Sequence, residues 1–221
     1  EIGSGLVGSE MCIRDSDNTK TPAENAQKYF DKYGKMKRTA EALNELILET
    51  KGQIDHLESI QNSLDIALSA DDLVQIKDEL IEYGFIKKGK GSKKQKVKSK
   101  PFHYISSDGF DMYVGKNNYQ NDELTFKLAT GNDWWFHAKG MPGSHVIVKA
   151  ENKELPDSTF EEAGKLAGYY SKGKNADKVE IDYLQKKNVK KPNGAAAGFV
   201  VYYTNYSLTI HPDISDIRQI E

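Results

Sequence analysis

Lysine is the residue type in this sequence that is best placed to do chemistry, because the lysines gather in two short runs. Residues 87–100 contain eight lysines and no acidic residue, and residues 186–191 contain four more. Ammonium groups at this density neutralise phosphates and release counterions, so both runs are suited to binding a nucleic-acid backbone. The net charge of −2 conceals this, because acidic residues are in excess over residues 17–85. The lysines of the first run are Lys87, Lys88, Lys90, Lys93, Lys94, Lys96, Lys98 and Lys100.

A second group of candidate residues combines aromatic, imidazole and amide side chains. Trp135, His137 and Lys139 alternate along one predicted strand, and His145 lies on the next. Aromatic faces beside basic groups hold single-stranded or irregular RNA. Side chains in residues 115–122 precede a predicted helix N-terminus, where backbone N–H groups favour phosphate. The candidate RNA-binding residues outside the first lysine run are therefore Lys116, Asn117, Asn118, Trp135, His137, Lys139, His145, Lys190 and Lys191.

Each of these assignments has a simpler alternative. A lysine-rich run is often only a solubilising spacer, and loop lysines often form a solvated face. A tryptophan is more often part of the core than a stacking platform. At least one of Trp134 and Trp135 must face inward, because neighbouring residues of a strand point to opposite faces. If the turn is residues 140–143, His137 pairs with Val146 and not with His145, so the two imidazoles point to opposite faces of the sheet. A shift of the strand register by one residue would place them on the same face.

Other kinds of chemistry find little support in the sequence. The single cysteine, Cys12, is remote, and neither His137 nor His145 has a carboxylate at ligand spacing, so we expect no metal site. There is no G-x-S-x-G motif and no P-loop, so we expect neither a cofactor nor enzymatic activity. There is also no secretory signal and no apolar run of about 18 residues. We therefore expect no membrane partner and a cytoplasmic location.

The first region that must position these residues is a predicted helical arm over residues 17–85. Thr21-Pro22-Ala23-Glu24 has the pattern of a capping box with proline at the first helical position. From Leu43 to Leu68, mostly apolar residues recur at alternating steps of four and three, which is typical of a coiled-coil seam. A second helix is predicted over residues 71–83, ending at Gly84. Such a seam needs a partner helix, which we expect upstream in the native protein or on another subunit.

The remaining regions differ sharply in character. Residues 1–16 have no period and resemble a translated sequencing adapter, so we treat them as a non-native tail. Residues 86–100 read as a flexible lysine-rich linker. Residues 101–221 read as a small α+β domain with a mostly antiparallel sheet. Its predicted strands are 102–106, 110–114, 133–139, 144–150, 179–184, 199–203 and 206–211, with 199–203 as a central strand paired with 206–211. Its predicted helices are 122–129, capped by Asn121, and 159–171, with a capping box from Ser158 to Glu161.

Several short motifs in the second half resemble the NFACT-R domain of the NFACT family, in the family's order. They are SDGF at 107–110, VGKNN at 114–118, QND at 120–122, DWWFHAK at 133–139, PGSHVI at 142–147, VKKP at 189–192 and YTNY at 203–206. Upstream, residues 21–30 resemble the entry to the family's returning coiled-coil helix. The resemblance covers nearly all of residues 20–214.

This resemblance implies an RNA-binding module and a role in ribosome-associated quality control. Members of the family bind the stalled large ribosomal subunit with its peptidyl-tRNA and recruit alanyl-tRNA for C-terminal alanine tailing. The implied partners are therefore the large subunit, rRNA and tRNA. The family's N-terminal domain, its helix-hairpin-helix domain and the outgoing half of its arm have no counterpart in this sequence. We therefore expect a C-terminal fragment that does not perform alanine tailing alone.

An older name within the family suggests a different function. That name, fibronectin-binding protein A-like, implies a surface adhesin. An adhesin of this kind would need export, whereas the sequence shows neither a secretory signal nor an anchor. The adhesin is therefore kept as the alternative function.

Overall fold

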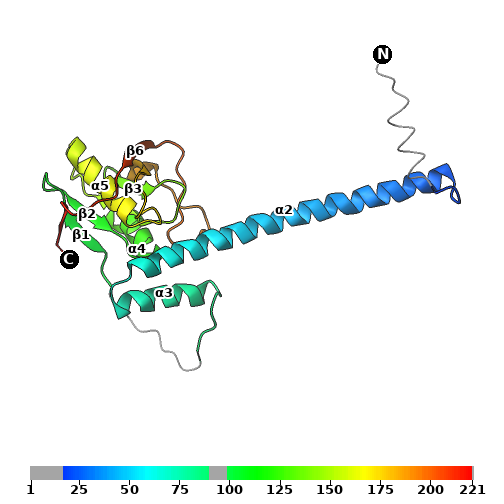
Figure 1. The fold of residues 1–221 in the computed structure, drawn as a ribbon, viewed down its shortest axis with the longest axis horizontal. Coiled ribbons are helices and arrows are strands. Elements are labelled where there is room, and N and C mark those ends of the chain that lie inside the picture. The colour runs from blue at the N-terminus through cyan, green and yellow to red at the C-terminus, as the bar shows by residue number, and fades with distance from the viewer. Residues whose placement is uncertain (1–16, 90–98, 221) are drawn as a thin grey trace, which may run out of the picture. The chain divides into compact units, whose positions relative to one another are not determined.

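The computed structural model describes residues 17–89 and 99–220, which Figure 1 draws as a coloured ribbon. The chain divides into two compact units, residues 1–53 and 54–221. The expected non-native tail, residues 1–16, lies outside the described residues. So do most of the expected linker and its lysines Lys90, Lys93, Lys94, Lys96 and Lys98. The division after Gln53 differs from the boundary expected at residues 86–100, because residues 54–85 belong to the second unit.

Helix α2 (Pro22–Ile66) begins with the capping box that the sequence predicts. The backbone N–H of Thr21 donates to Oε2 of Glu24 at 2.8 Å, and the N–H of Glu24 donates to Oγ1 of Thr21 at 3.3 Å. In the first unit the seam is open to solvent: Leu43 is 50 % exposed and Ile47 is 48 % exposed. The need for a partner helix stays a prediction.

Helix α3 (Ala70–Glu82) confirms the second predicted helix, and it belongs to the second unit. Ser69 and Asp72 form a capping box at its start, and Gly84 follows its end with a φ of +76°. That left-handed backbone is available to glycine without the cost that a Cβ would add.

The second unit is built on a seven-stranded sheet in the order β6-β5-β3-β4-β2-β1-β7, with every neighbouring pair antiparallel. This confirms the predicted α+β class. The strands are β1 (Phe102–Ile105), β2 (Asp111–Val114), β3 (Trp134–Ala138), β4 (Val146–Val148), β5 (Val179–Gln185), β6 (Tyr206–Ile210) and β7 (Arg218–Gln219).

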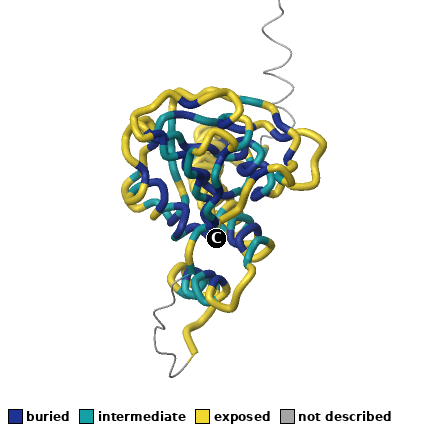
Figure 2. Tube along the Cα trace, turned by 90° about the vertical axis from the view of Figure 1, so that its left-hand side faces the viewer, coloured by how far each residue is buried: buried dark blue, intermediate teal, exposed yellow. Residues whose placement is uncertain are grey.

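Helices cover both faces of the sheet, and each face has its own core. Helix α5 (Asp157–Tyr169) packs on one face, where Leu166 meets Phe136 and Val146. Helix α4 (Asn118–Glu123) and the π-helical turn Leu124–Leu128 lie on the other, where Leu124 packs with Trp135 and Ile147. Figure 2 shows the buried segments running through the centre of this unit and the exposed ones following its loops.

The predicted central strand over residues 199–203 is wrong, because this segment lies over the sheet instead of entering it. Its only pairing within the described residues is an isolated bridge between Val201 and Lys190. Val200 and Tyr202 pack on the Trp135 core, whereas Tyr203 is 87 % exposed. Strand β6 pairs with β5 instead. An apolar run in a covering loop and one in a buried strand look alike in sequence.

Two predicted helix starts are also wrong. Helix α4 is capped by Asn117, whose Oδ1 accepts from the N–H of Gln120 at 3.0 Å, and not by Asn121. Helix α5 follows Pro156 without a side-chain cap, since the hydroxyl of Ser158 donates to Asp108 at 2.6 Å. In both cases the residue predicted to cap has a partner elsewhere in the fold.

Replacing Gly168 by alanine should destabilise the second unit. A Cβ at Gly168 would lie 2.7 Å from Cδ1 of Ile210 and 3.2 Å from Cβ of Pro212. We expect a loss of about 1–3 kcal/mol in the free energy of unfolding, measured by urea denaturation. Gly52→Ala is the control, because no atom lies within 4 Å of a Cβ there, and it should lose no stability. A Gly168→Ala protein as stable as the parent would contradict this packing.

Candidate nucleic-acid interface

The hairpin formed by β3 and β4 places the two candidate histidines on the same face of the sheet. Phe136 pairs with Val146, so His137 lies opposite His145. The predicted register is wrong by one residue, because the connecting loop makes its own bridge between Gly143 and Ser171 and does not close as a simple four-residue turn. The two imidazole rings are perpendicular, with centroids 5.5 Å apart.

Four of the candidate residues are buried, and their side chains do not reach a surface ligand in this fold. The exposed fractions are 0 % for Trp135, 1 % for Asn117, 5 % for Asn118 and 2 % for His145. Trp135 lies in the core beneath Tyr202, with ring centroids 5.3 Å apart. The prediction that Trp135 is a stacking platform is therefore wrong, and the core alternative holds for it.

The two buried asparagines join α4 to the helices that precede the sheet. The Nδ2 of Asn117 donates to Oε1 of Gln75 at 2.7 Å. The Nδ2 of Asn118 donates to Oγ of Ser59 and to Oε1 of Glu79, both at 2.8 Å. These amides hold α3 and the end of α2 against the domain, so their role here is structural and they are not phosphate ligands.

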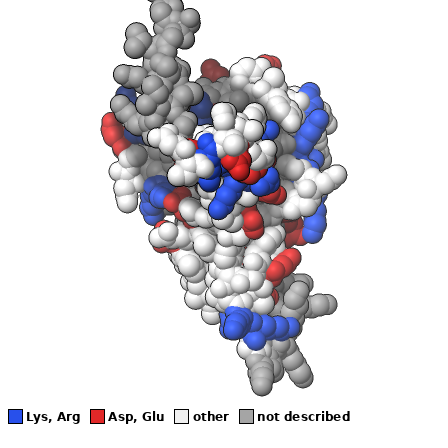
Figure 3. Space-filling model, turned by 90° about the vertical axis from the view of Figure 1, so that its right-hand side faces the viewer, with Lys and Arg blue, Asp and Glu red and all other residues white. Residues whose placement is uncertain are grey.

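The candidate lysines that the structure describes fall into two groups. Three lie beside acids: Lys116 is 3.7 Å from Asp72, Lys139 is 2.7 Å from Glu180, and Lys191 is paired with Asp122. The others, Lys87, Lys88, Lys100 and Lys190, are exposed. Figure 3 shows basic and acidic side chains intermixed on the face that it views.

The histidines belong to a polar row that crosses the sheet, which the sequence did not reveal. His145 Nδ1 is 2.8 Å from Oγ1 of Thr125, and His137 pairs across the sheet with Asp182. Asp182 accepts hydrogen bonds from three further side chains of one segment: Tyr202 Oη at 2.9 Å, Asn205 Nδ2 at 2.8 Å and Ser207 Oγ at 2.7 Å. The register error hid this row, because it placed the two imidazoles on different faces.

Loss of solvation lowers the pKa of both imidazoles. The pKa of His137, which is half-buried, falls to about 4, and the pKa of the buried His145 falls well below its ordinary value. Among the residues that the structure describes, no group of three or more histidine, cysteine or acidic side chains could hold a metal ion.

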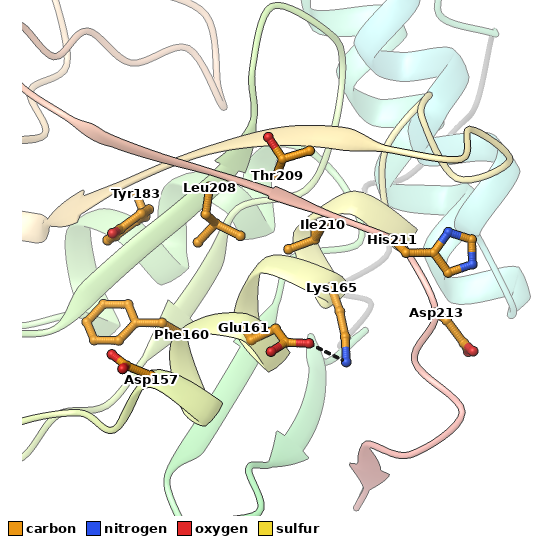
Figure 4. Close-up of a pocket in the computed structure, with 10 residues that line it drawn as sticks. All are labelled: Asp157, Phe160, Glu161, Lys165, Tyr183, Leu208, Thr209, Ile210, His211 and Asp213. Atoms are coloured by element: carbon orange, nitrogen blue, oxygen red, sulfur yellow. Dashed lines mark ion pairs between the residues drawn. The ribbon is translucent and has the colours of Figure 1, made fainter.

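A cavity of about 540 Å³ lies between α5 and the edge strand β6 (Figure 4). Acidic side chains exceed lysines in its lining: Asp157, Glu161 and Asp213 line it with a single lysine, Lys165, which pairs with Glu161 at 2.8 Å. This excess of carboxylates disfavours a phosphate backbone, so the cavity is not part of the candidate nucleic-acid interface.

A second feature that sequence reasoning missed is an aromatic cluster on the α5 side of the sheet. Trp134, Tyr183 and Tyr206 come from β3, β5 and β6, and each is within reach of the other two. The rings of Tyr183 and Tyr206 stack with centroids 5.5 Å apart, and Trp134 lies 5.9 Å from Tyr183 and 6.5 Å from Tyr206. The alternation of large apolar residues in 206–210 could have signalled it, since such residues share a face.

Antiparallel α+β domains that carry exposed aromatic residues and basic loops occur among nucleic-acid-binding modules. Comparison with known families agrees with this: residues 100–203 match the NFACT protein RNA binding domain, and residues 15–100 match the NFACT N-terminal and middle domains. The chain belongs to the NFACT family. The resemblance carried by the sequence motifs is thereby confirmed.

Two similar proteins come from bacteria of different genera. The chain is 41 % identical over 206 residues to the Rqc2 homolog RqcH of Streptococcus pneumoniae, covering 93 % of this chain and 37 % of that protein. It is 38 % identical over 205 residues to the Rqc2 homolog RqcH of Bacillus subtilis, covering 91 % and 35 %. The chain therefore spans little more than a third of the length of these relatives.

A solved structure has the same fold. It is the C-terminal part of the fibronectin/fibrinogen-binding protein from Streptococcus suis, with a TM-score of 0.81 and 38 % identity, covering 97 % of this chain and 90 % of that one.

Stability should fall as the pH drops from 7 towards 4, because the unfolded chain then binds protons that the folded chain excludes. The pKa of His137 falls from 6.5 to about 4 on folding. Its contribution, on the order of 3 kcal/mol, is present above pH 6.5 and is lost as the pH falls through the folded value. Urea denaturation between pH 7 and pH 5 should show a steep slope that His137→Gln flattens.

The exposed His211 provides the control for this measurement. His211→Gln keeps the polar row intact and should retain the steep slope of the parent. Equal slopes for the parent and His137→Gln would contradict the burial of this imidazole.

Proposed function

We propose that this chain is the RNA- and ribosome-binding part of a ribosome quality control factor. The observation that carries this is the match of residues 100–203 to an RNA-binding domain, in a fold whose loops carry exposed lysines. Among the described residues, Lys187 and Lys190 lie within 4 Å of no carboxylate, so their charge is available to phosphate. The similarity to RqcH proteins supports the same assignment.

We further propose that the partners are the large ribosomal subunit with its rRNA and a tRNA. In the full-length protein this part would help to recruit alanyl-tRNA for C-terminal alanine tailing. The chain alone would bind RNA without catalysing a reaction and without a cofactor, in the cytoplasm. None of the helices among the described residues is long and apolar enough to cross a membrane.

The salt dependence of RNA binding tests the role of the first lysine run. We propose to replace all eight lysines of residues 87–100 by serine and to measure the dissociation constant for deacylated tRNA over a range of salt concentrations. The slope of log Kd against log salt should fall by about 0.7–0.9 for each phosphate contact that is lost. Co-sedimentation with large ribosomal subunits should weaken in parallel.

A triple variant, with Lys127, Lys153 and Lys165 replaced by serine, is the matched control. Each of these lysines already pairs with a glutamate, at 3.7, 3.1 and 2.8 Å respectively. Their loss should therefore change the slope little. If the slope of the eight-lysine variant equals that of the parent, the run is a spacer and not part of the interface.

The alternative is a surface adhesin, which the name of the Streptococcus suis structure favours. It predicts that the native protein is found on the cell surface and that the chain binds immobilised fibronectin with an affinity that is insensitive to its lysine runs. Surface labelling of intact cells distinguishes the two functions, since a ribosome-bound factor would be labelled only after lysis.

A further inference from the structure

Strand β5 extends beyond its partner β6 at one end of the sheet. Tyr183 pairs with Tyr206, the first residue of β6, whereas Gln185 pairs only with Trp134 of β3. The chain before Tyr206 turns away, and a cavity of about 370 Å³ is left at this end. Its lining combines aromatic rings with amide side chains.

The aromatic side of this cavity is formed by Tyr206, whose ring is held in place before any ligand binds and has one face open. Tyr206 is 64 % exposed, yet its ring is held by stacking on Tyr183 at 5.5 Å with an interplanar angle of 30°. Tyr183 is supported in turn by Phe160 of α5, with ring centroids 5.3 Å apart. A rigid ring with a free face accepts another flat π-system at low entropic cost.

The polar wall offers hydrogen-bonding groups that nothing else uses. Among the residues that the structure describes, the side-chain amides of Gln185 and Asn188 make no hydrogen bond, although both line the cavity. Asn205 is fixed there, because its Nδ2 donates to Oδ1 of Asp182 at 2.8 Å. An amide presents a donor and an acceptor side by side, which matches the edge of a nucleobase.

A lysine pair stands between two of the lining residues in the chain. Lys186 and Lys187 lie between Gln185 and Asn188 in a 3₁₀ turn, which is held to the domain by a hydrogen bond from the N–H of Lys187 to the carbonyl of Gly131 at 3.1 Å. The Nζ of Lys186 lies over the ring of Phe126, 5.6 Å from its centroid, so the exposed Lys187 is the cation that remains for a ligand. The nearby carboxylate of Asp133 is already paired with Lys149. The positive charge beside the cavity is therefore not cancelled by that carboxylate.

We propose that this cavity binds an unpaired nucleobase of single-stranded RNA, with the base stacked on Tyr206, its edge toward Gln185 and Asn188, and its phosphate near Lys187. The proposal rests on the proposed RNA-binding function and names the form of RNA that the domain takes. A base within a duplex is stacked on both sides, so it cannot present its face to Tyr206.

The test compares a short fluorescein-labelled oligoadenylate with the same strand annealed to oligouridylate, by fluorescence anisotropy. Tyr206→Ala should bind the single strand about 5- to 100-fold more weakly and bind the duplex as the parent does. Tyr206→Phe keeps the ring and should stay within about twofold of the parent. Tyr203→Ala is the control, because Tyr203 is 87 % exposed and does not line the cavity.

Two further measurements keep the test decisive if Tyr206→Ala is unstable. Asn188 is exposed, and Asn188→Ala should also weaken binding of the single strand alone. An oligonucleotide that carries 4-thiouridine should crosslink on irradiation to the peptide that contains Tyr206. Parent-like binding by Tyr206→Ala and Asn188→Ala, or equal losses for single strand and duplex, would overturn this site while leaving RNA binding intact. Failure of the parent to bind either RNA would overturn the proposed function itself.

Discussion

The alternation of side chains along β3 is the constraint on which the rest of this domain depends. Trp134 and Trp135 are neighbours in sequence, so the pleat sends them to opposite faces of the sheet. Trp135 is buried completely and fills the core under the covering loop, whereas Trp134 joins the aromatic cluster at the end of β5 and β6. The same alternation places His137 beside Trp135, with ring centroids 5.6 Å apart, and therefore in the polar row.

Sequence reasoning succeeded where the information is local. The starts of α2 and α3, the first hairpin and the α+β class follow from capping residues, turn residues and alternation, all of which act over a few positions. The register of β3 and β4 could not be predicted, because it depends on a bridge from Gly143 to Ser171, far along the chain. The burial of Asn117 and Asn118 depends likewise on partners in α2 and α3. A polar segment that lies in an exposed loop and one that is buried by distant hydrogen-bond partners have the same amino-acid composition, so the sequence alone does not distinguish them.

Within the second unit, the buried Glu79 connects three helices through its side chain. Its carboxylate is fully buried, and its Oε1 is 2.8 Å from both His56 and Asn118, so it links α2, α3 and α4. Burial raises the pKa of this carboxyl, because the charged form loses its solvation. A group of this kind stabilises one arrangement of the three helices over others, since separating them would leave its partners unsatisfied. The helices that precede the sheet are thus part of the domain's own architecture.

The carboxylate of Asp182 fixes the end of the covering loop, residues 202–207, to strand β5 through several hydrogen bonds. Tyr202, Asn205 and Ser207 all donate to this one carboxylate, from both sides of the point where the covering loop becomes a strand. The end of the loop is therefore held to the sheet by side-chain hydrogen bonds as well as by the peptide chain itself. A protease that cuts beside Asn193 and Gly194, which are exposed, would leave both fragments in place. A nicked domain would then migrate as one particle under native conditions and as two pieces only after denaturation.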